Sequence, residues 1–500
     1  MGQLDEESAA MRKAALLLAL LLLTSLSFAH IGSPDIIYEG NAGPYKIQVT
    51  IKPPDVVPGT AQILVKLENQ NSAKITLQPV YYEYGSEGAP DADIATIVPG
   101  EAGLYQGKLW LMSFGSSSVK VSVEGVKGYG STLVPVPAIA TATRKMDNTT
   151  GIVLCILGFL LFAGLVSLIG ACVREATITA GHKVSRKRSK MALIVMAVTG
   201  LVLISTLTFA KKWWDNVEFQ YRKNMYKPLQ ISSSVVDGKL KLAIANPEWL
   251  SRKVADIAPD HGKLMHLFMV SADDKTFAHL HPVRTDTSSF YTELPPLPAG
   301  NYTLFAEVVH KDGMGETVTD TVTIKSTATN PLSDADDSWY ITGKTKDDVQ
   351  IVPDIPASVK AGQVVNLNFT IKKEGKDVTL QPYLGMAGHA AVMKADQSVF
   401  IHLHPMGTIS MAAQYAIAGR VDEKVTLCGT LNDSLTTKFD TLGLADKHQV
   451  SLMQAPRPVL FNNHITFPYA FPTAGAYYVW VQVKEADKVH TARFEVRVGE

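Results

Sequence analysis

Residues 265–282 read MHLFMVSADDKTFAHLHP, and residues 388–405 read GHAAVMKADQSVFIHLHP. Both stretches contain one histidine, twelve intervening residues and then His-x-His-Pro, without a gap in the register. Each is followed by a proline, a glycine and an alternating segment, LPAGNYTLFAEV from Leu297 and FPTAGAYYVWVQV from Phe471. The sequence therefore contains two copies of one β-rich domain.

Each histidine stretch is predicted to form a β-hairpin. In the first copy, apolar and polar residues alternate on both sides of the polar turn 271–275. Residues two apart in a strand point to the same face, so His279 and His281 should project together, and the returning strand should bring His266 beside them. The same spacing predicts that His389, His402 and His404 converge.

Three converging imidazoles are a common arrangement for a transition metal, and neutral imidazole suits copper or zinc. The competing interpretation is that the histidines are polar core or surface residues and that Pro282 and Pro405 only end strands. Identical offsets in two diverged copies favour metal. Six methionines lie near the two histidine stretches in the sequence: Met265, Met269, Met386, Met393, Met406 and Met411. Methionine is a ligand that suits Cu(I), but it also commonly fills apolar cores.

The composition suggests globular parts joined to a membrane component. The chain has 500 residues, 46% of them hydrophobic, which fits about three domains. Lys plus Arg and Asp plus Glu each total 47, so net charge gives no argument for a nucleic-acid partner. Three cysteines, two of them in a hydrophobic run, do not define a disulfide framework.

Residues 1–29 are interpreted as a secretory signal peptide, with Arg12-Lys13, an apolar core and Ser27-Phe28-Ala29 as the cleavage site. Cleavage there would make His30 the first residue. Its α-amino group and imidazole could then chelate one copper ion as a histidine brace, an arrangement present in CopC-like carriers and copper monooxygenases. The simpler interpretation is that a histidine follows the cleavage site by chance.

Residues 30–145 alternate as strands do, which predicts a β-sandwich. Pro58-Gly59, Gly103-Leu104-Tyr105 and the segment 119–123 resemble the YtkA-like and FixH-like extracytoplasmic domains. That group is linked to copper handling and oxidase assembly. This copy has no histidine between His30 and His182, so no metal site of its own is expected.

Two hydrophobic runs, 151–173 and 191–210, are long enough to cross a bilayer as helices. The basic link 174–190 between them should lie in the cytoplasm by the positive-inside rule, which puts both soluble regions on the extracytoplasmic side of the cytoplasmic membrane. Lys211-Lys212-Trp213-Trp214 is typical of an interface anchor.

The two histidine-hairpin domains are expected at 226–325 and 338–500, separated by a polar linker. The second contains an insertion, 407–462, which is interpreted as a solvated excursion or, with Asp446, His448 and Met453, as a lid over the site. Tandem sandwiches with HLHP resemble a group of bacterial secreted or membrane-anchored proteins, and the resemblance implies fold and compartment rather than activity.

The fold class expected is mainly β: three Ig-like or cupredoxin-like sandwiches with a two-helix transmembrane hairpin. No P-loop, Rossmann fingerprint, nucleophile elbow or HExxH motif is present. The leading hypothesis is a non-enzymatic protein that binds copper, or alternatively zinc, and delivers it to a protein partner. An adhesion or sensing scaffold without metal and a copper oxidoreductase are the alternatives.

Overall fold

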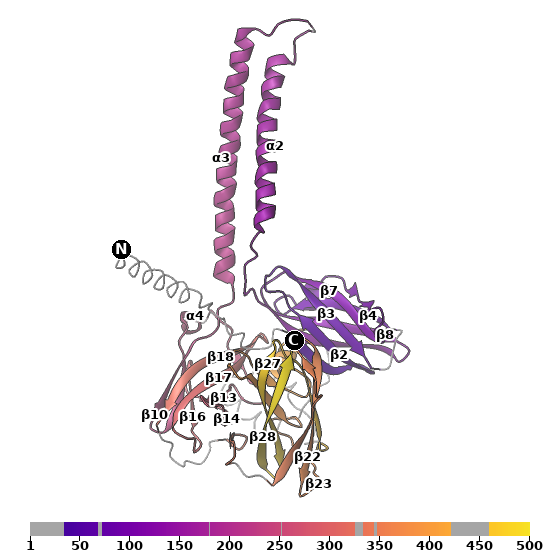
Figure 1. The fold of residues 1–500 in the computed structure, drawn as a ribbon, viewed down its shortest axis with the longest axis vertical. Helices are drawn as coiled ribbons and strands as arrows, with labels where there is room; N and C mark the ends of the chain where they lie inside the picture. The colour runs from indigo at the N-terminus through magenta and orange to yellow at the C-terminus, as the bar shows by residue number, and fades with distance from the viewer. Residues whose placement is uncertain are drawn as a thin grey trace, which may run out of the picture.

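The computed structural model describes residues 35–68, 73–179, 181–251, 253–325, 334–344, 348–421 and 460–500. Within these residues the protein is mainly β, with six sheets and two long apolar helices, as the sequence predicts. Figure 1 shows the helices projecting together from one side of a cluster of β-domains. His30, Cys428, Asp446, His448 and Met453 lie outside the described residues.

The N-terminal domain is built from two antiparallel sheets whose inner faces form one apolar core. The alternation of buried and exposed residues in β3 and β7 shows why this sequence forms strands with one covered face. The first sheet has the order β1 (Ile36–Ala42), β2 (Tyr45–Lys52), β3 (Gly59–Leu67), β7 (Leu104–Leu111), β6 (Thr96–Ile97). The second has the order β5 (Asp93–Ile94), β4 (Lys74–Tyr81), β8 (Gly115–Gly125), β9 (Gly128–Ala138), with the short helix η1 (Ser86–Gly88) after β4.

Two helices, α2 (Asn148–Glu175) and α3 (Arg186–Asn224), form the hairpin. Their most apolar windows have mean hydropathies of 2.9 and 2.3 and are 0% and 6% buried, so both helices could cross a membrane. Side-chain caps from Asp147 and Ser185 begin them. Helix α3 extends from the end of the predicted span at Ala210 to Asn224 before the chain enters the next domain.

The first histidine-hairpin domain also contains two sheets. One has the order β10 (Ile231–Val236), β11 (Lys239–Ile244), β16 (Ser289–Glu293), β15 (Val283–Arg284), with α4 (Pro247–Leu250) after β11. The other has the order β12 (Ile257–Ala258), β17 (Gly300–His310), β13 (His266–Ser271), β14 (Thr276–Leu280), β19 (Ser338–Ile341), and β18 (Gly315–Ile324) also pairs with β17. Strand β19, expected in the second domain, therefore completes a sheet of the first.

The second histidine-hairpin domain repeats this plan. One sheet consists of β20 (Val349–Asp354), β22 (Val364–Lys373) and β23 (Lys376–Asp377), with β26 (His464–Ala470) on β22. The other has the order β21 (Val359–Lys360), β28 (Lys488–Gly499), β27 (Gly475–Glu485), β24 (His389–Lys394), β25 (Phe400–Leu403). The start of the insertion forms a largely buried helix, α5 (Met411–Val421), and is not a solvated excursion.

The two histidine-hairpin domains pack against each other through the faces of their hairpin sheets. Phe277 of the first stacks on Trp480 of the second with ring centroids 4.8 Å apart, and Phe305 stacks on Phe400 at 4.1 Å. Phe277 and Phe400 occupy the same position of the repeat, and Phe305 and Trp480 share another. The two copies therefore face each other about an approximate two-fold axis, around a buried aromatic core.

The N-terminal domain docks on the second copy beside its HLHP sequence. The main chains of β1 and residues 406–408 bond as strands do, from Glu39 N to Met406 O at 2.8 Å and from Thr408 N to Ile37 O at 2.9 Å. Between them Gly407 has a φ of 112°, and a Cβ there would lie 2.1 Å from the Ile37 oxygen. Only glycine fits this contact.

Gly407→Ala should therefore destabilise the full-length protein more than Gly115→Ala does, by about 1–3 kcal/mol. Gly115 is a matched control because its φ is 117° and a Cβ there would meet no atom within 4 Å. Thermal unfolding of both variants in detergent measures the difference. Equal losses of stability would show that the contact between β1 and residue 407 is not formed.

Candidate metal centre

The first histidine set consists of His266, His279 and His281, and the hairpin brings their rings together as the spacing predicts. Strands β13 and β14 are antiparallel, with Leu267 opposite Leu280, so His266 at the start of β13 lies across from the end of β14. His266 Nδ1 and His279 Nε2 are 3.2 Å apart. One ligand atom from each of the three residues lies within 4.8 Å of the others, so this cluster could hold a metal ion.

The second histidine set consists of His389, His402 and His404, and its hairpin pairs the first two rings in the same way as in the first set. His389 Nδ1 and His402 Nε2 are 2.9 Å apart. The ring of His404 lies 5.1 Å from that of His389 and 4.5 Å from that of His402, measured between centroids. Each of the six histidine residues is 2% exposed or less, so the rings are enclosed by protein.

The outer nitrogen of each ring in the first set has its own polar partner. His266 Nε2 lies 3.2 Å from the Asp260 carbonyl oxygen, and His281 Nδ1 lies 2.8 Å from Asp337 Oδ1. His279 Nδ1 lies 2.8 Å from Oε1 of Gln482, which comes from β27 of the other domain. The Gln482 amide is oriented by its own donation to Ser338 Oγ.

The second set has the corresponding partners. His389 Nε2 lies 3.1 Å from the Tyr383 carbonyl oxygen, and His404 Nδ1 lies 3.0 Å from the Ile409 carbonyl oxygen. His402 Nδ1 lies 2.7 Å from Oε2 of Glu307, which comes from β17 of the first domain. Each domain therefore supplies the side chain that orients one histidine of the other.

These outer contacts determine what the inner nitrogens can do. A neutral imidazole has one N–H, and a carbonyl oxygen can only accept, so a ring that donates outward presents a lone pair inward. In His266 and His389 that lone pair lies on Nδ1, next to the partner's Nε2. Nitrogen ligands at 2.0–2.1 Å from one tetrahedral ion are about 3.3 Å apart, close to the separations in both sets.

Unpartnered nitrogens add to this fit. Nε2 of His281 and Nε2 of His404 are buried and make no hydrogen bond among the described residues. A buried polar atom without a partner costs about 1–3 kcal/mol. A cation shared by the inner nitrogens would satisfy them, so the donor set fits a metal with three imidazole ligands and hydrogen-bonded outer nitrogens.

The two sets adjoin at the domain interface. The His402 ring lies 5.2 Å from that of His266 and 5.6 Å from that of His279, between centroids. Phe268 packs against both sets, stacked on His279 at 4.2 Å and at 5.0 Å from His402. The protein thus gathers six imidazoles into one enclosed centre.

Burial dominates the electrostatics of the centre. Desolvation lowers the pKa of His266, His279, His389 and His402 well below 6.5, and that of His404 to about 3, because a charged ring would lose its hydration. The same cause raises the pKa of Glu307 to about 8. Neutral rings are the form that binds metal.

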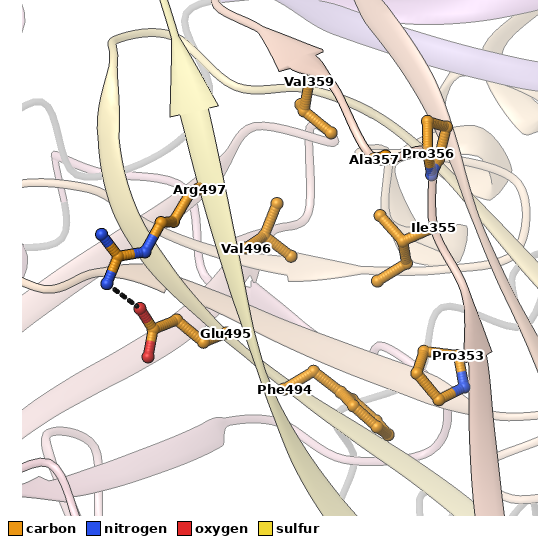
Figure 2. A pocket seen from close by; sticks show the side chains of 9 residues that line it. All are labelled: Pro353, Ile355, Pro356, Ala357, Val359, Phe494, Glu495, Val496 and Arg497. Atoms are coloured by element: carbon orange, nitrogen blue, oxygen red, sulfur yellow. Dashed lines mark ion pairs between the residues drawn. The ribbon is translucent and has the colours of Figure 1, made fainter.

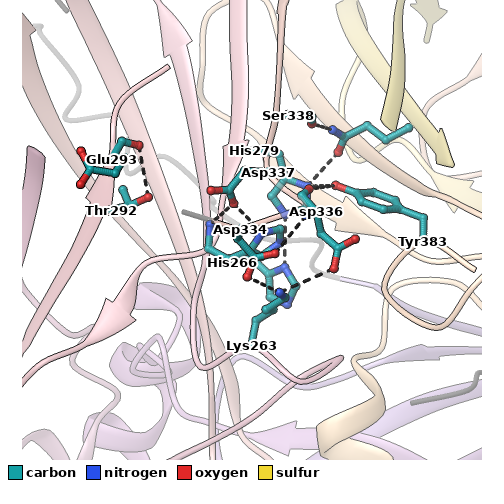
Figure 3. A network of polar contacts seen from close by, with 12 residues as sticks. Lys263, His266, His279, Thr292, Glu293, Asp334, Asp336, Asp337, Ser338 and Tyr383 are labelled. Atoms are coloured by element: carbon teal, nitrogen blue, oxygen red, sulfur yellow. Dashed lines mark hydrogen bonds and ion pairs between the residues drawn. The ribbon is translucent and has the colours of Figure 1, made fainter. Parts of the chain in front are cut away.

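An acidic cluster borders the first set, as Figure 3 shows. Asp337 holds His281, while Asp334 and Asp336 pair with Lys263, the latter at 3.6 Å. His281, Asp334 and Asp337 form a second group that could hold a cation. These aspartates lie at the end of the segment expected to be only a linker, and no histidine spacing marked them in the sequence.

The methionines near the histidines lie in apolar cores. Met265 and Met269 belong to the core of the first domain, and Met386, Met406 and Met411 pack in the core shared with the N-terminal domain. Met393 lies in the interface core. The pocket in Figure 2, lined by residues of β20, β21 and β28 with the ion pair Glu495–Arg497 at 3.2 Å, contains no histidine.

Comparisons with known proteins identify no activity. The family model described as "Domain of unknown function (DUF8832)" matches residues 230–326, 344–427 and 448–500, which include both histidine sets. No curated protein matches the chain. Similar solved structures include a tetra-tandem repeat from the extending region of a large adhesion protein, at 10% identity over 88% of this chain and 71% of that one, with a TM-score of 0.16.

Two further structures are similarly distant. The native conformation of E. coli alpha-2-macroglobulin has 10% identity and a TM-score of 0.15, and the match covers 91% of this chain but 25% of that one. The D00-D0 domain of Intimin has 11% identity and a TM-score of 0.14, over 55% of this chain and 100% of that one. Likeness at this level does not bear on the site.

In the metal-free protein we expect His266 and His389 to be neutral, with the proton on Nε2, from pH 8 down to pH 5. The carbonyls of Asp260 and Tyr383 require a donor, and burial holds both pKa values well below 6.5. Ring ¹⁵N shifts of histidine-labelled protein report the tautomer. A proton on Nδ1, or protonation of both nitrogens before pH 5, would contradict the geometry.

Proposed function

We propose that the chain is a membrane-anchored extracytoplasmic metalloprotein whose two histidine sets each bind one copper ion between the tandem domains. The observation that carries the proposal is the pairing of inner nitrogens at 3.2 and 2.9 Å, in rings whose outer nitrogens already have partners. When His279 and His402 also donate outward, to Gln482 and Glu307, two lone pairs face each other at this distance, and a shared cation would bridge them.

Copper is favoured over zinc by the surroundings of the rings. Both metals accept imidazole, but the energy cost of burying an ion rises steeply with its charge, so monovalent Cu(I) suits an enclosed set of neutral ligands. The resemblance of the N-terminal domain to YtkA-like and FixH-like domains agrees with copper. Burial of all six rings also favours a resident ion over one that is exchanged rapidly with a partner.

The helices and the basic link support the proposed compartment. All described β-domains lie at one end of the helical hairpin in Figure 1, and the link with Arg186, Lys187 and Arg188 lies at the other. The positive-inside rule would place that link in the cytoplasm and every β-domain outside it. Thiols are not needed at this centre, which suits an oxidising compartment.

Protease added to spheroplasts should therefore degrade both the region before α2 and the region after α3, and it should leave the helical hairpin protected. Antibodies against tags at the N-terminal domain and at the C-terminus measure each half separately. Lysed spheroplasts are the control for protease access. Protection of either β-region in intact spheroplasts, with cleavage after lysis, would contradict the proposed topology.

Metal content provides the direct test of the two sets. The full-length protein should bind two copper ions, and His279→Gln with His281→Gln, or His402→Gln with His404→Gln, should each leave one. His310→Gln is the matched control. His310 is buried in the first domain but belongs to neither set, and its Nε2 lies 3.0 Å from Oε1 of Glu316. Elemental analysis after dialysis measures the stoichiometry.

Thermal unfolding supports the same test, because a hundredfold excess of metal over Kd should stabilise the protein by about 2.7 kcal/mol per site. Unchanged copper content and equal metal-induced stabilisation in wild type and both double variants would show that the histidines are structural. A protein that takes up no metal would instead favour an adhesion or sensing scaffold.

A copper oxidoreductase is the second candidate, and it is favoured by one observation: the two sets adjoin, with rings 5.2 Å apart. Ions held in neighbouring sites can exchange electrons with each other. Turnover with an added reductant, lost in both double variants, would distinguish this activity from copper binding alone.

A further inference from the structure

The strongest unexplained feature of the centre is a seventh imidazole, His261. It lies in the loop between β12 and β13 of the first domain, outside the repeated histidine pattern. Its ring approaches the second set, with centroids 4.9 Å from both His389 and His404, but lies 6.2 Å from His266 of its own domain. One ligand atom each from His261, His389 and His404 fall within 4.8 Å of one another.

Neither ring nitrogen of His261 has hydrogen-bond geometry with a partner among the described residues, although the side chain is only 1% exposed and the Leu384 main chain lies near the ring. The nearest carboxylate oxygen, Asp260 Oδ2, is 3.8 Å away, beyond hydrogen-bond distance. Burial lowers the pKa of His261 to about 3, against a smaller opposing effect of the Leu384 main chain. The ring is therefore neutral and has a free lone pair.

The backbone is arranged to place this ring. His261 has a φ of 50°, in the left-handed region that non-glycine residues rarely adopt, and Gly262 follows with a φ of 80°. The loop is closed by main-chain bonds of 2.8 Å in both directions between Asp260 and Lys263. Asp260 Oδ1 accepts from Ala412 N of α5 at 2.8 Å, which attaches the loop to the second domain.

The second domain has the same loop without the histidine. Its equivalent position is Leu384, with a φ of 50°, followed by Gly385 with a φ of 79°. The strained turn is thus shared by both copies, and only the first copy places a metal-binding side chain on it. The two sets consequently differ in the imidazoles available to them.

We infer that His261 is a metal ligand contributed across the domain boundary, which completes the second histidine set as a four-imidazole site. This inference rests on the proposed function. A site with four protein ligands is closed, as in structural metal sites, so its ion would hold the two domains together. The first set, with three imidazoles, keeps a position open to a small exogenous ligand.

The test uses full-length protein carrying His279→Gln and His281→Gln, so that one equivalent of Cu(I) occupies the second set alone and is oxidised in place with an added oxidant for EPR. His261→Leu is then added, because Leu384 shows that leucine is compatible with this loop. We expect copper affinity to fall by at least about tenfold and the number of imidazole nitrogens counted by pulsed EPR to fall from four to three. His310→Gln in the same background should change neither.

The outcomes separate this inference from the proposed function. Identical affinity and nitrogen count with and without His261 would overturn the inference alone, whereas a parent that binds no copper would overturn both. Metal-free unfolding checks the fold: His261→Leu should be no less stable than its parent, since two unpartnered nitrogens are removed. If it is less stable, His261→Asn, which tolerates left-handed backbone, replaces it in the same measurements.

Discussion

The centre depends on the docking of two copies of one domain, face to face, so that each completes the hydrogen bonds of the other. Gln482 of the second domain orients His279, and Glu307 of the first orients His402. These two residues occupy the same position on β27 and β17. The aromatic stacks of Phe277 on Trp480 and Phe305 on Phe400 exclude water beside them, which strengthens every polar contact within.

Burial of the histidines explains both the orientation of their rings and their protonation. Six rings lie between two sheets without access to bulk water. Burial makes protonation unfavourable for the rings of His266, His279, His389, His402 and His404. His266 and His389 donate their single N–H outward to main-chain carbonyls and present a lone pair inward. The described part of the N-terminal domain, which begins at residue 35, contributes no ring, yet it holds residues 406–408 next to His404 and so supports the second set from outside. The helical hairpin holds these domains together at one membrane surface in the proposed arrangement.

The sequence predicted the mainly β class, the helical hairpin and the convergence of three rings in each copy, because strand periodicity and a repeated spacing determine them locally. It did not reveal Gln482, Glu307 or Asp337, because their roles arise only when distant segments meet. His261 was missed for a related reason: its counterpart in the repeat is Leu384, so comparison of the two copies gave no signal for it.

Residues 338–341 were assigned to the wrong copy because the sequence pattern of a strand does not indicate which sheet the strand joins. The buried helix α5 was taken for a solvated excursion because its contacts come from other domains.

X-ray absorption at the copper edge of the full-length protein, loaded with two Cu(I) ions, tests the central claim most directly. The account predicts a first shell of three to four nitrogen scatterers at about 2.0 Å, with the outer-ring scattering of imidazole and no sulfur shell. A first shell dominated by sulfur, or by oxygen without imidazole scattering, would contradict a centre built from these two histidine sets.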